Sequence, residues 1–132
     1  LPCSRPVKVQ VLTDFQAAGY ERTHQWNEKL FQNARPVLEA TLIDLSGGGI
    51  RMHSEIHYEK ESLVRISLDI ICNDEPKQLE LLGEVVMSYS LENDRSIYET
   101  RVQFKAVPNE ITEMIVKYIF MEQRITQQKL RR

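Results

Sequence analysis

The chain has little of what would assign it at once to several large classes of protein. Its two cysteines, Cys3 and Cys72, are too few for the disulfide framework of a small secreted domain. The longest apolar runs, such as residues 68–72 with Asp69 inside, fall far short of the roughly 18 residues that a membrane-spanning helix needs. The formal net charge of -2 gives no overall basic field to attract nucleic acid or anionic lipid. The first residues also lack the charged start and apolar centre of a secretory signal. We therefore expect a cytoplasmic protein with reduced thiols that neither inserts into a membrane nor binds DNA or RNA.

Recognisable catalytic and metal-binding motifs are also missing from the sequence. Residues 46–49, Ser-Gly-Gly-Gly, lead into a predicted strand, whereas a phosphate-binding loop ends in Gly-Lys-Ser or Gly-Lys-Thr and leads into a helix. Ser46 is not part of a Gly-x-Ser-x-Gly turn, and no paired acid and base stands out. His53 and His57 would lie about 13 Å apart along a strand, which is too far to chelate one ion. We interpret the chain as a binding module and not an enzyme, with no metal and no cofactor.

The composition and the apolar periodicity predict one mainly β domain over residues 1–132. A chain of this length has room for a single core, and 42% apolar with 27% charged residues are usual values for a globular protein. Alternation of apolar and polar residues with a period of two predicts strands over most of the chain. These strands cover residues 6–12, 37–44, 50–52, 64–70, 79–88 and 98–104.

The end of the chain has a different period. After residue 108 the apolar residues recur at steps of three, four and seven, which predicts an amphipathic helix over residues 110–130. Asn109 is a suitable N-cap, and Glu110 and Glu113 place negative charge in the first turn, where the helix dipole favours it. The last turn is basic, with Lys129, Arg131 and Arg132. Six strands and one terminal helix are typical of a small antiparallel barrel or a strongly curled sheet, with the helix at an open end or against a partner.

Residues 13–36 fit neither period. We predict a long connection there, with one or two helical turns around residues 24–33. Trp26 is expected to anchor this connection by packing it against the domain.

Residues 44–49, Asp-Leu-Ser-Gly-Gly-Gly, form the best candidate for a ligand site. Asp44 and Ser46 are two positions apart at a strand end and so point to the same face, and glycine amides follow directly. Asp44 can accept two hydrogen bonds from the N1–H and N2–H₂ edge of a guanine, while Ser46 and the amides can donate to oxygens. The alternative is that both side chains bond only the turn's own backbone and that the glycines serve positive φ angles.

These residues resemble the Asp-x-Ser-x-x-Gly motif of PilZ domains, with Ile50-Arg51-Met52 following as it often does in that family. The end of the chain is similar to the closing strand and helix of flagellar-brake-type members, through residues 101–104, 115–120 and 123–124. The resemblance covers most of the chain except residues 13–36. It implies a six-stranded antiparallel PilZ-type β-barrel with a C-terminal α-helix, and the binding of cyclic di-GMP, a bacterial second messenger.

Family members also carry two arginines four positions apart just before the first strand, and this pair is absent from the sequence. None of the arginines has another arginine four residues later; only Arg101, followed by Lys105, comes near, on a different strand. We expect the pair to fall directly upstream of Leu1. The alternative is a degenerate PilZ domain that acts through protein contacts and does not bind the nucleotide.

The resemblance assigns Asp44 and Ser46 to guanine recognition, and Gly48 and Gly49 to the backbone shape that lets the ligand approach. Arg51 is expected to stack on a guanine or to meet a phosphate; the alternative is an exposed strand arginine with no contact to the ligand. The function implied is a non-enzymatic receptor that switches conformation on binding cyclic di-GMP, in bacterial motility or exopolysaccharide control. A neighbouring domain or a partner protein is expected to receive the signal, and the C-terminal helix offers a surface for a homodimer.

Overall fold

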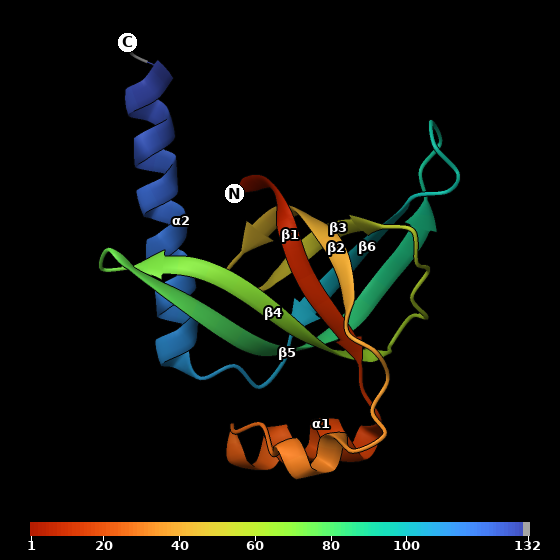
Figure 1. The fold of residues 1–132 in the computed structure, drawn as a ribbon. Helices are drawn as coiled ribbons and strands as arrows, with labels where there is room; N and C mark the ends of the chain where they lie inside the picture. The colour runs from red at the N-terminus through yellow and green to blue at the C-terminus, as the bar shows by residue number, and fades with distance from the viewer. Residues whose placement is uncertain (131–132) are drawn as a thin grey trace.

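The computed structural model describes residues 1–130, which form six β-strands, two α-helices and one short 3-10 helix (Figure 1). The strands are β1 (Pro2–Val11), β2 (Leu38–Ser46), β3 (Gly49–Ser54), β4 (Leu63–Cys72), β5 (Glu75–Ser90) and β6 (Tyr98–Phe104). The helices are α1 (Asp14–Thr23), the 3-10 helix η1 (Glu28–Phe31) and α2 (Asn109–Leu130). Arg131 and Arg132, which the sequence places at the basic end of α2, lie outside the described residues.

The strands close into one antiparallel barrel in the order β1-β2-β3-β6-β5-β4. This confirms the predicted six-stranded antiparallel barrel with a C-terminal helix. Each predicted strand overlaps an observed one, because period-two alternation follows directly from having one face of each strand in the core. The sequence does not reveal which strands pair with strands distant along the chain. In the barrel, β3 pairs with β6 in this way.

The barrel interior is filled by side chains that alternate with outward-facing ones along each strand. The largest fully buried side chains on the strands include Leu42, Leu45, Met52, Ile66, Leu68 and Leu81. Each contributes about 1.5–3 kcal/mol through burial. Ile115 and Tyr118 of α2 complete this core at one end of the barrel. Figure 1 shows the second half of α2 projecting beyond the barrel. Within residues 1–130, no helix is both long enough and apolar enough to cross a bilayer.

The connection between β1 and β2 is more ordered than the sequence analysis expects. Helix α1 covers residues 14–23, where an irregular segment was predicted, and η1 lies within the predicted helical range. Thr13 and Gln16 form a capping box at the start of α1. The sequence shows no clear helical period here, because α1 buries only a short stripe around Ala17 and Tyr20.

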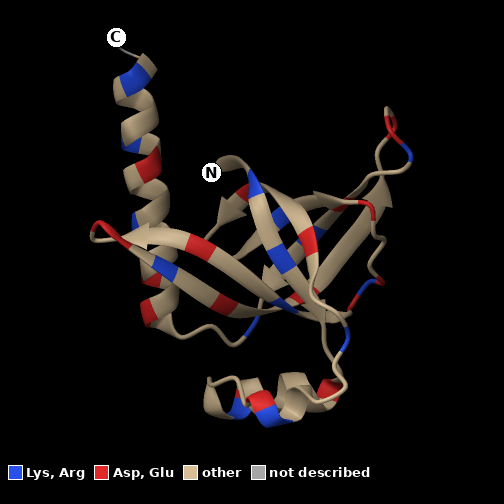
Figure 2. Ribbon diagram, viewed as in Figure 1, with Lys and Arg blue, Asp and Glu red and all other residues tan. Residues whose placement is uncertain are grey.

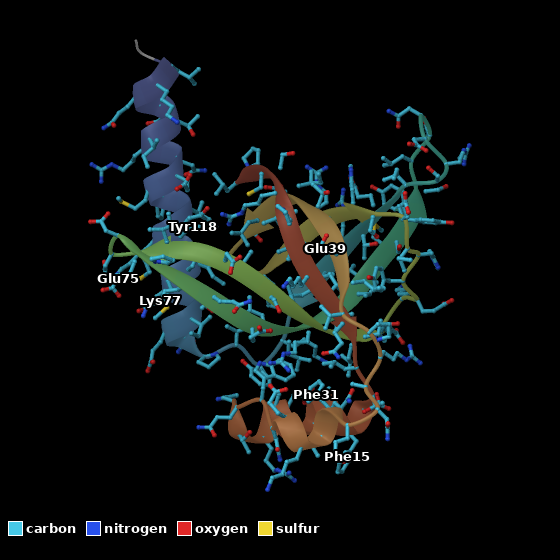
Figure 3. The ribbon with its side chains drawn as sticks, in the orientation of Figure 1. Phe15, Phe31, Glu39, Glu75, Lys77 and Tyr118 are labelled. Carbon is cyan, nitrogen blue, oxygen red and sulfur yellow. The ribbon has the colours of Figure 1, made fainter. Side chains whose placement is uncertain are left out.

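Trp26 packs this segment against the barrel, as predicted. Its ring stacks on Tyr20 with a centroid distance of 4.3 Å, and its Nε1–H donates to the carbonyl of Glu80 at 2.9 Å. The guanidinium of Arg65 lies over two rings of the segment, with its Cζ 4.5 Å from the ring centroid of Trp26 and 5.0 Å from that of Phe31. Figure 3 shows Phe31 on the barrel side of the segment and Phe15 on the far side.

Candidate functional site

The turn between β2 and β3 carries the Asp44–Gly49 motif. The pairing of β2 with β3 shifts register between Leu42 and Asp44, so that Leu42 and Leu45 both point into the core. Asp44 and Ser46, which flank Leu45, therefore lie together on the outer face of the barrel. The strand pattern thus presents a carboxylate and a hydroxyl side by side, as the sequence predicts.

The two side chains differ in what they bond. Ser46 Oγ accepts a hydrogen bond from the amide of Gly48 and donates to the carbonyl of Gly49, both at 3.3 Å, so it stabilises its own turn. The Asp44 carboxylate makes its contacts elsewhere: it lies 3.0 Å from the amino group of Leu1 and 4.0 Å from Arg51 Nη2. In this structure Ser46 thus bonds its own turn, as the alternative expects, whereas Asp44 does not. Asp44, with its side chain 45% exposed, is accessible to a ligand.

Gly49 is required by close packing between strands. A Cβ at this position would overlap the carbonyl oxygen of Val102, because Gly49 begins β3 where β3 pairs with β6. A Cβ at Gly48 would meet open space. The alternative also had the glycines serve positive φ angles, and this part is wrong, since no glycine in residues 1–130 has one.

The predicted site residues converge on one open pocket of about 410 Å³. Asp44, Ser46, Gly48, Gly49 and Arg51 all line it, so the structure brings the whole predicted set together. The lining also includes residues that the sequence analysis did not assign to the site, namely Ile50, Val86, Arg101, Val102 and Gln103.

Glu99 lies beside this pocket and joins four other side chains into what we call the Glu99 cluster: Glu99, Arg51, Arg101, His53 and Tyr89. Its carboxylate is 3.4 Å from Arg51 Nη1, 3.5 Å from Arg101 Nη2 and 3.1 Å from His53 Nε2. It also accepts a hydrogen bond from the hydroxyl of Tyr89. The side chain of Glu99 is only 7% exposed although it points away from the barrel core. The cluster therefore holds a buried, charged carboxylate on the outer surface of the sheet.

The cluster shifts the acidity of two of its groups. Burial alone would raise the pKa of Glu99, but the hydrogen bonds from Tyr89 and His53 and the charges of the two arginines outweigh it and hold the pKa below its usual value. The hydrogen bond to Glu99 raises the pKa of Tyr89. Both directions favour an ionised Glu99 that accepts a hydrogen bond from a neutral Tyr89.

The sequence analysis missed Glu99 and Arg101 as parts of the site. Their outward direction was readable, because Thr100 and Val102 alternate with them and are buried. The missing information was the pairing of β6 with β3, which sets Arg101 opposite Arg51 and Glu99 opposite His53. Arg101 had been set aside as lying on a different strand from the expected arginine pair, and that strand borders the pocket.

The two histidines considered as metal ligands contact different side chains. His53 contacts Glu99, whereas the ring of His57 packs near that of Tyr98, with centroids 5.4 Å apart. Among residues 1–130, no group of three or more His, Cys, Asp or Glu side chains is arranged to hold a metal ion.

A closed six-stranded barrel with a terminal helix and an Asp-x-Ser-x-x-Gly turn at a surface pocket defines a class of small antiparallel β-barrel domains. The PilZ domain family matches residues 20–121, and the chain belongs to this family. The resemblance stated from the sequence is thereby confirmed, and the family is one of cyclic di-GMP receptors, generally without catalytic activity.

Solved structures of two proteins share this fold. The Bacillus subtilis inhibitor of motility (MotI/DgrA) has a TM-score of 0.67 at 10% identity, over 93% of this chain and 48% of that one. K. pneumonia MrkH in its apo state has a TM-score of 0.53 at 14% identity, over 100% of this chain and 52% of that one. The chain thus spans about half the length of these proteins, and the likeness at such identities concerns the fold. No curated protein sequence matches the chain.

Proposed function

We propose that the chain is a non-enzymatic receptor domain for cyclic di-GMP that acts in the bacterial cytoplasm, in the control of motility or exopolysaccharide. The observation that carries this proposal is that the five predicted site residues line one pocket in a member of a cyclic di-GMP receptor family. The pocket volume of about 410 Å³ falls in the range of small-molecule sites.

The chemistry of the pocket suits a guanine nucleotide. The exposed carboxylate of Asp44 can accept the N1–H and N2–H₂ groups of guanine, which form a paired donor edge. The Ser46 hydroxyl and the amides of the glycine turn can donate to ligand oxygens once the ligand replaces their present partners. Arg51, with its side chain 38% exposed at the pocket, suits either a phosphate or the face of a base.

The start of β1 lies beside the Asp44 carboxylate. The amino group of Leu1 lies 3.0 Å from the Asp44 carboxylate and donates to the carbonyl of Leu45. A segment placed upstream of Leu1 therefore begins at the pocket. In the proposed mechanism, arginines on such a segment close over the bound nucleotide and complete the site.

The motif turn also contacts the C-terminal helix, which gives the proposed switch an output. A Cβ at Gly47 would lie 3.2 Å from a methyl group of Val116 and 3.9 Å from one of Thr112, both on α2. A ligand that moves the turn therefore presses directly on the helix. We propose that this contact passes the binding event to a neighbouring domain or a partner protein.

Calorimetric titration with cyclic di-GMP tests the proposal. Four proteins are compared: the chain itself, a form extended upstream of Leu1 by about a dozen native residues, and the Asp44→Ala and Arg95→Gln variants of that longer form. We expect the longer form to bind most tightly. Loss of the Asp44 hydrogen bonds weakens binding by about tenfold to a hundredfold.

Arg95 is the matched control, because it lies exposed in the loop between β5 and β6, away from the pocket lining. We expect its substitution to leave the dissociation constant within about twofold of the longer form's value. Absence of binding by the chain and by the longer form would contradict the receptor function, as would unchanged binding by Asp44→Ala.

A second candidate is an interaction module that pairs with a second copy through α2. The observation that favours it is a groove of about 620 Å³ between α2 and the tip of the β4–β5 hairpin. Beside this groove, Phe120, Met121 and Ile71 are 62%, 53% and 55% exposed. Figure 2 shows acidic residues at the hairpin tip next to α2.

The charges of α2 suit an antiparallel pairing of two copies. Glu110 and Glu113 lie near its start, and Arg124 and Lys129 near its end, so an antiparallel partner sets acidic residues against basic ones. The mass of the protein in solution, measured by light scattering over a concentration series, tests this candidate.

A further inference from the structure

Two arginines stand side by side on the outer surface of the barrel at the pocket. Arg51 of β3 and Arg101 of β6 are directly opposed in the strand register, and both line the pocket. On the side of β3 away from β6, Arg51 is opposed to Asp44 of β2. Glu99 lies two residues before Arg101, on the same outer face of β6.

This arrangement is unfavourable for the sheet unless it is compensated. Like charges directly opposite one another on neighbouring strands destabilise the pairing. Glu99 provides the compensation, since its two carboxylate oxygens lie 3.4 Å from Arg51 and 3.5 Å from Arg101. The carboxylate is 7% exposed, whereas the arginine side chains are 38% and 52% exposed. A buried anchor thus fixes two side chains whose outer surfaces face solvent.

We propose that Arg51 and Arg101 form a two-arginine site for the phosphodiester groups of the ligand, and that Glu99 is the positioning residue that holds them. This inference rests on the proposed cyclic di-GMP receptor function and deepens it, because it assigns a phosphate contact to β6. The family motif lies on β2 and β3 and does not include Arg101 or Glu99.

The donors left free by Glu99 support this assignment. A guanidinium has five N–H donors in a planar fork that matches phosphate oxygens. Glu99 contacts Nη1 of Arg51 and Nη2 of Arg101, so each arginine keeps other donors. Arg51 Nη2 is 4.0 Å from Asp44, beyond hydrogen-bond distance, so this donor is also available. A guanine that occupies Asp44 removes the remaining competitor for Arg51.

Titration of cyclic di-GMP into Arg101→Gln and Arg95→Gln, both in the longer form described above, tests the site. We expect Arg101→Gln to raise the dissociation constant by about tenfold to a hundredfold, because a charged hydrogen bond to phosphate is lost. Arg95→Gln removes the same charge from an exposed loop and is expected to change binding less than about twofold. The affinity of Arg101→Gln should also fall less steeply with salt concentration. Equal binding by the two variants would overturn the proposal.

A second probe separates failure of this proposal from failure of the receptor function. Inorganic pyrophosphate carries phosphate groups without guanine, and its binding is followed by the NMR side-chain signals of the arginines. If cyclic di-GMP does not bind the unaltered protein, the receptor function fails. The arginine site is then supported by pyrophosphate shifts at Arg51 and Arg101 that exceed those at Arg95, and it is overturned if the three arginines respond alike.

Glu99→Gln and Glu99→Asp test the positioning role. We expect Glu99→Gln to raise the dissociation constant severalfold and to broaden or average the side-chain signals of Arg51 and Arg101 in a protein that still folds. Glu99→Asp keeps the charge, and we expect it to recover part of the affinity and of the arginine order. The positioning role is wrong if the Glu99→Gln variant binds cyclic di-GMP as tightly as the unaltered protein. It is also wrong if the side-chain signals of Arg51 and Arg101 do not change.

Discussion

Glu99 occupies a position on the outer face of β6 where an exposed charge is the usual finding, and yet its side chain is almost fully buried. Arg51 and His53 of β3 and Tyr89 of β5 bury it from the two neighbouring strands, and Arg101 covers it from its own strand. Such burial is tolerated because the carboxylate meets positive charge and hydrogen-bond donors on several sides, which offsets the loss of hydration. A single residue thereby organises the side chains that border the candidate ligand pocket.

The lowered pKa of Glu99 predicts a dependence of stability on pH. Because the folded-state pKa lies below the unfolded value of about 4.3, its contribution to stability is fully present above that pH and is lost as the pH falls through the folded value. We expect Glu99→Gln to lower the free energy of unfolding at pH 7 by on the order of 2–4 kcal/mol. The difference from the unaltered protein should shrink in acid, as urea denaturation between pH 7 and pH 3 can measure.

Glu92→Gln is the matched control, since Glu92 is exposed in the loop between β5 and β6. Its effect should stay within about 0.5 kcal/mol over the whole range. A difference for Glu99→Gln that does not change with pH would contradict the assignment of a lowered pKa to this carboxyl.

The two adjacent glycines of the turn predict opposite outcomes for one substitution. Gly49→Ala places a methyl group against the carbonyl of Val102, and relief requires β3 and β6 to move apart. We expect a loss of about 1–3 kcal/mol or more in the free energy of unfolding. Gly48→Ala meets open space, and we expect little change. Urea denaturation of both variants measures the difference, and equal stabilities would show that the strands do not approach closely at Gly49.

At the scale of elements, the sequence predicts those features that depend on neighbours along the chain. Alternation of apolar and polar residues predicts the strands, and the change of apolar period at residue 108 predicts α2. The observed helix begins one residue before the predicted one and ends at the same residue. Helix α1 was missed because its short buried stripe, with Ala17 and Tyr20, is completed by residues from elsewhere in the chain such as Leu82. The Glu99 cluster was missed for the same reason, because its members come from three strands whose order only the closed barrel establishes.

The packing of Trp26 predicts that the segment from α1 to η1 can detach from the barrel as a unit. Trp26→Ala removes the stacking on Tyr20 and Arg65 and the hydrogen bond to the Glu80 carbonyl. Because Trp26 is half-buried, we expect a cost of about 2 kcal/mol, less than for a fully buried tryptophan. Hydrogen exchange should show faster exchange in residues 14–31 while the barrel strands keep their protection.

Trp26→Phe serves as the comparison, because it keeps an aromatic ring and loses the indole N–H. We expect it to cost about 1 kcal/mol, the contribution of one hydrogen bond. If the barrel strands lose protection together with residues 14–31 in Trp26→Ala, the segment is not a separate unit and this interpretation is wrong.

At the scale of the whole molecule, the β2–β3 turn lies between the ligand pocket, which it lines, and α2, which also borders the groove. The ligand pocket lies at the β2–β3 turn, and Gly47 of that turn abuts Val116 on α2. The groove lies farther along α2, against the β4–β5 hairpin, with Met121 in its lining. A change in the turn can therefore reach the surface that a second copy would cover without any rearrangement of the barrel strands.

Self-association through α2 predicts that one exposed phenylalanine matters and another does not. Phe120, on α2, is 62% exposed beside the groove, and Phe15, on α1, is 73% exposed at the far end of the molecule (Figures 1 and 3). Phe120→Lys sets a charge into the apolar contact, and in an antiparallel pair the two new lysines come close together. We expect it to raise the dissociation constant of the dimer by about a hundredfold, because two large apolar contacts are lost at once. Phe15→Lys should leave the dissociation constant unchanged.

Light scattering or sedimentation over micromolar to millimolar protein measures the dissociation constants of both variants, with circular dichroism to confirm folding. A protein that stays monomeric throughout, or a dimer disrupted by Phe15→Lys and not by Phe120→Lys, would exclude α2 as the pairing surface.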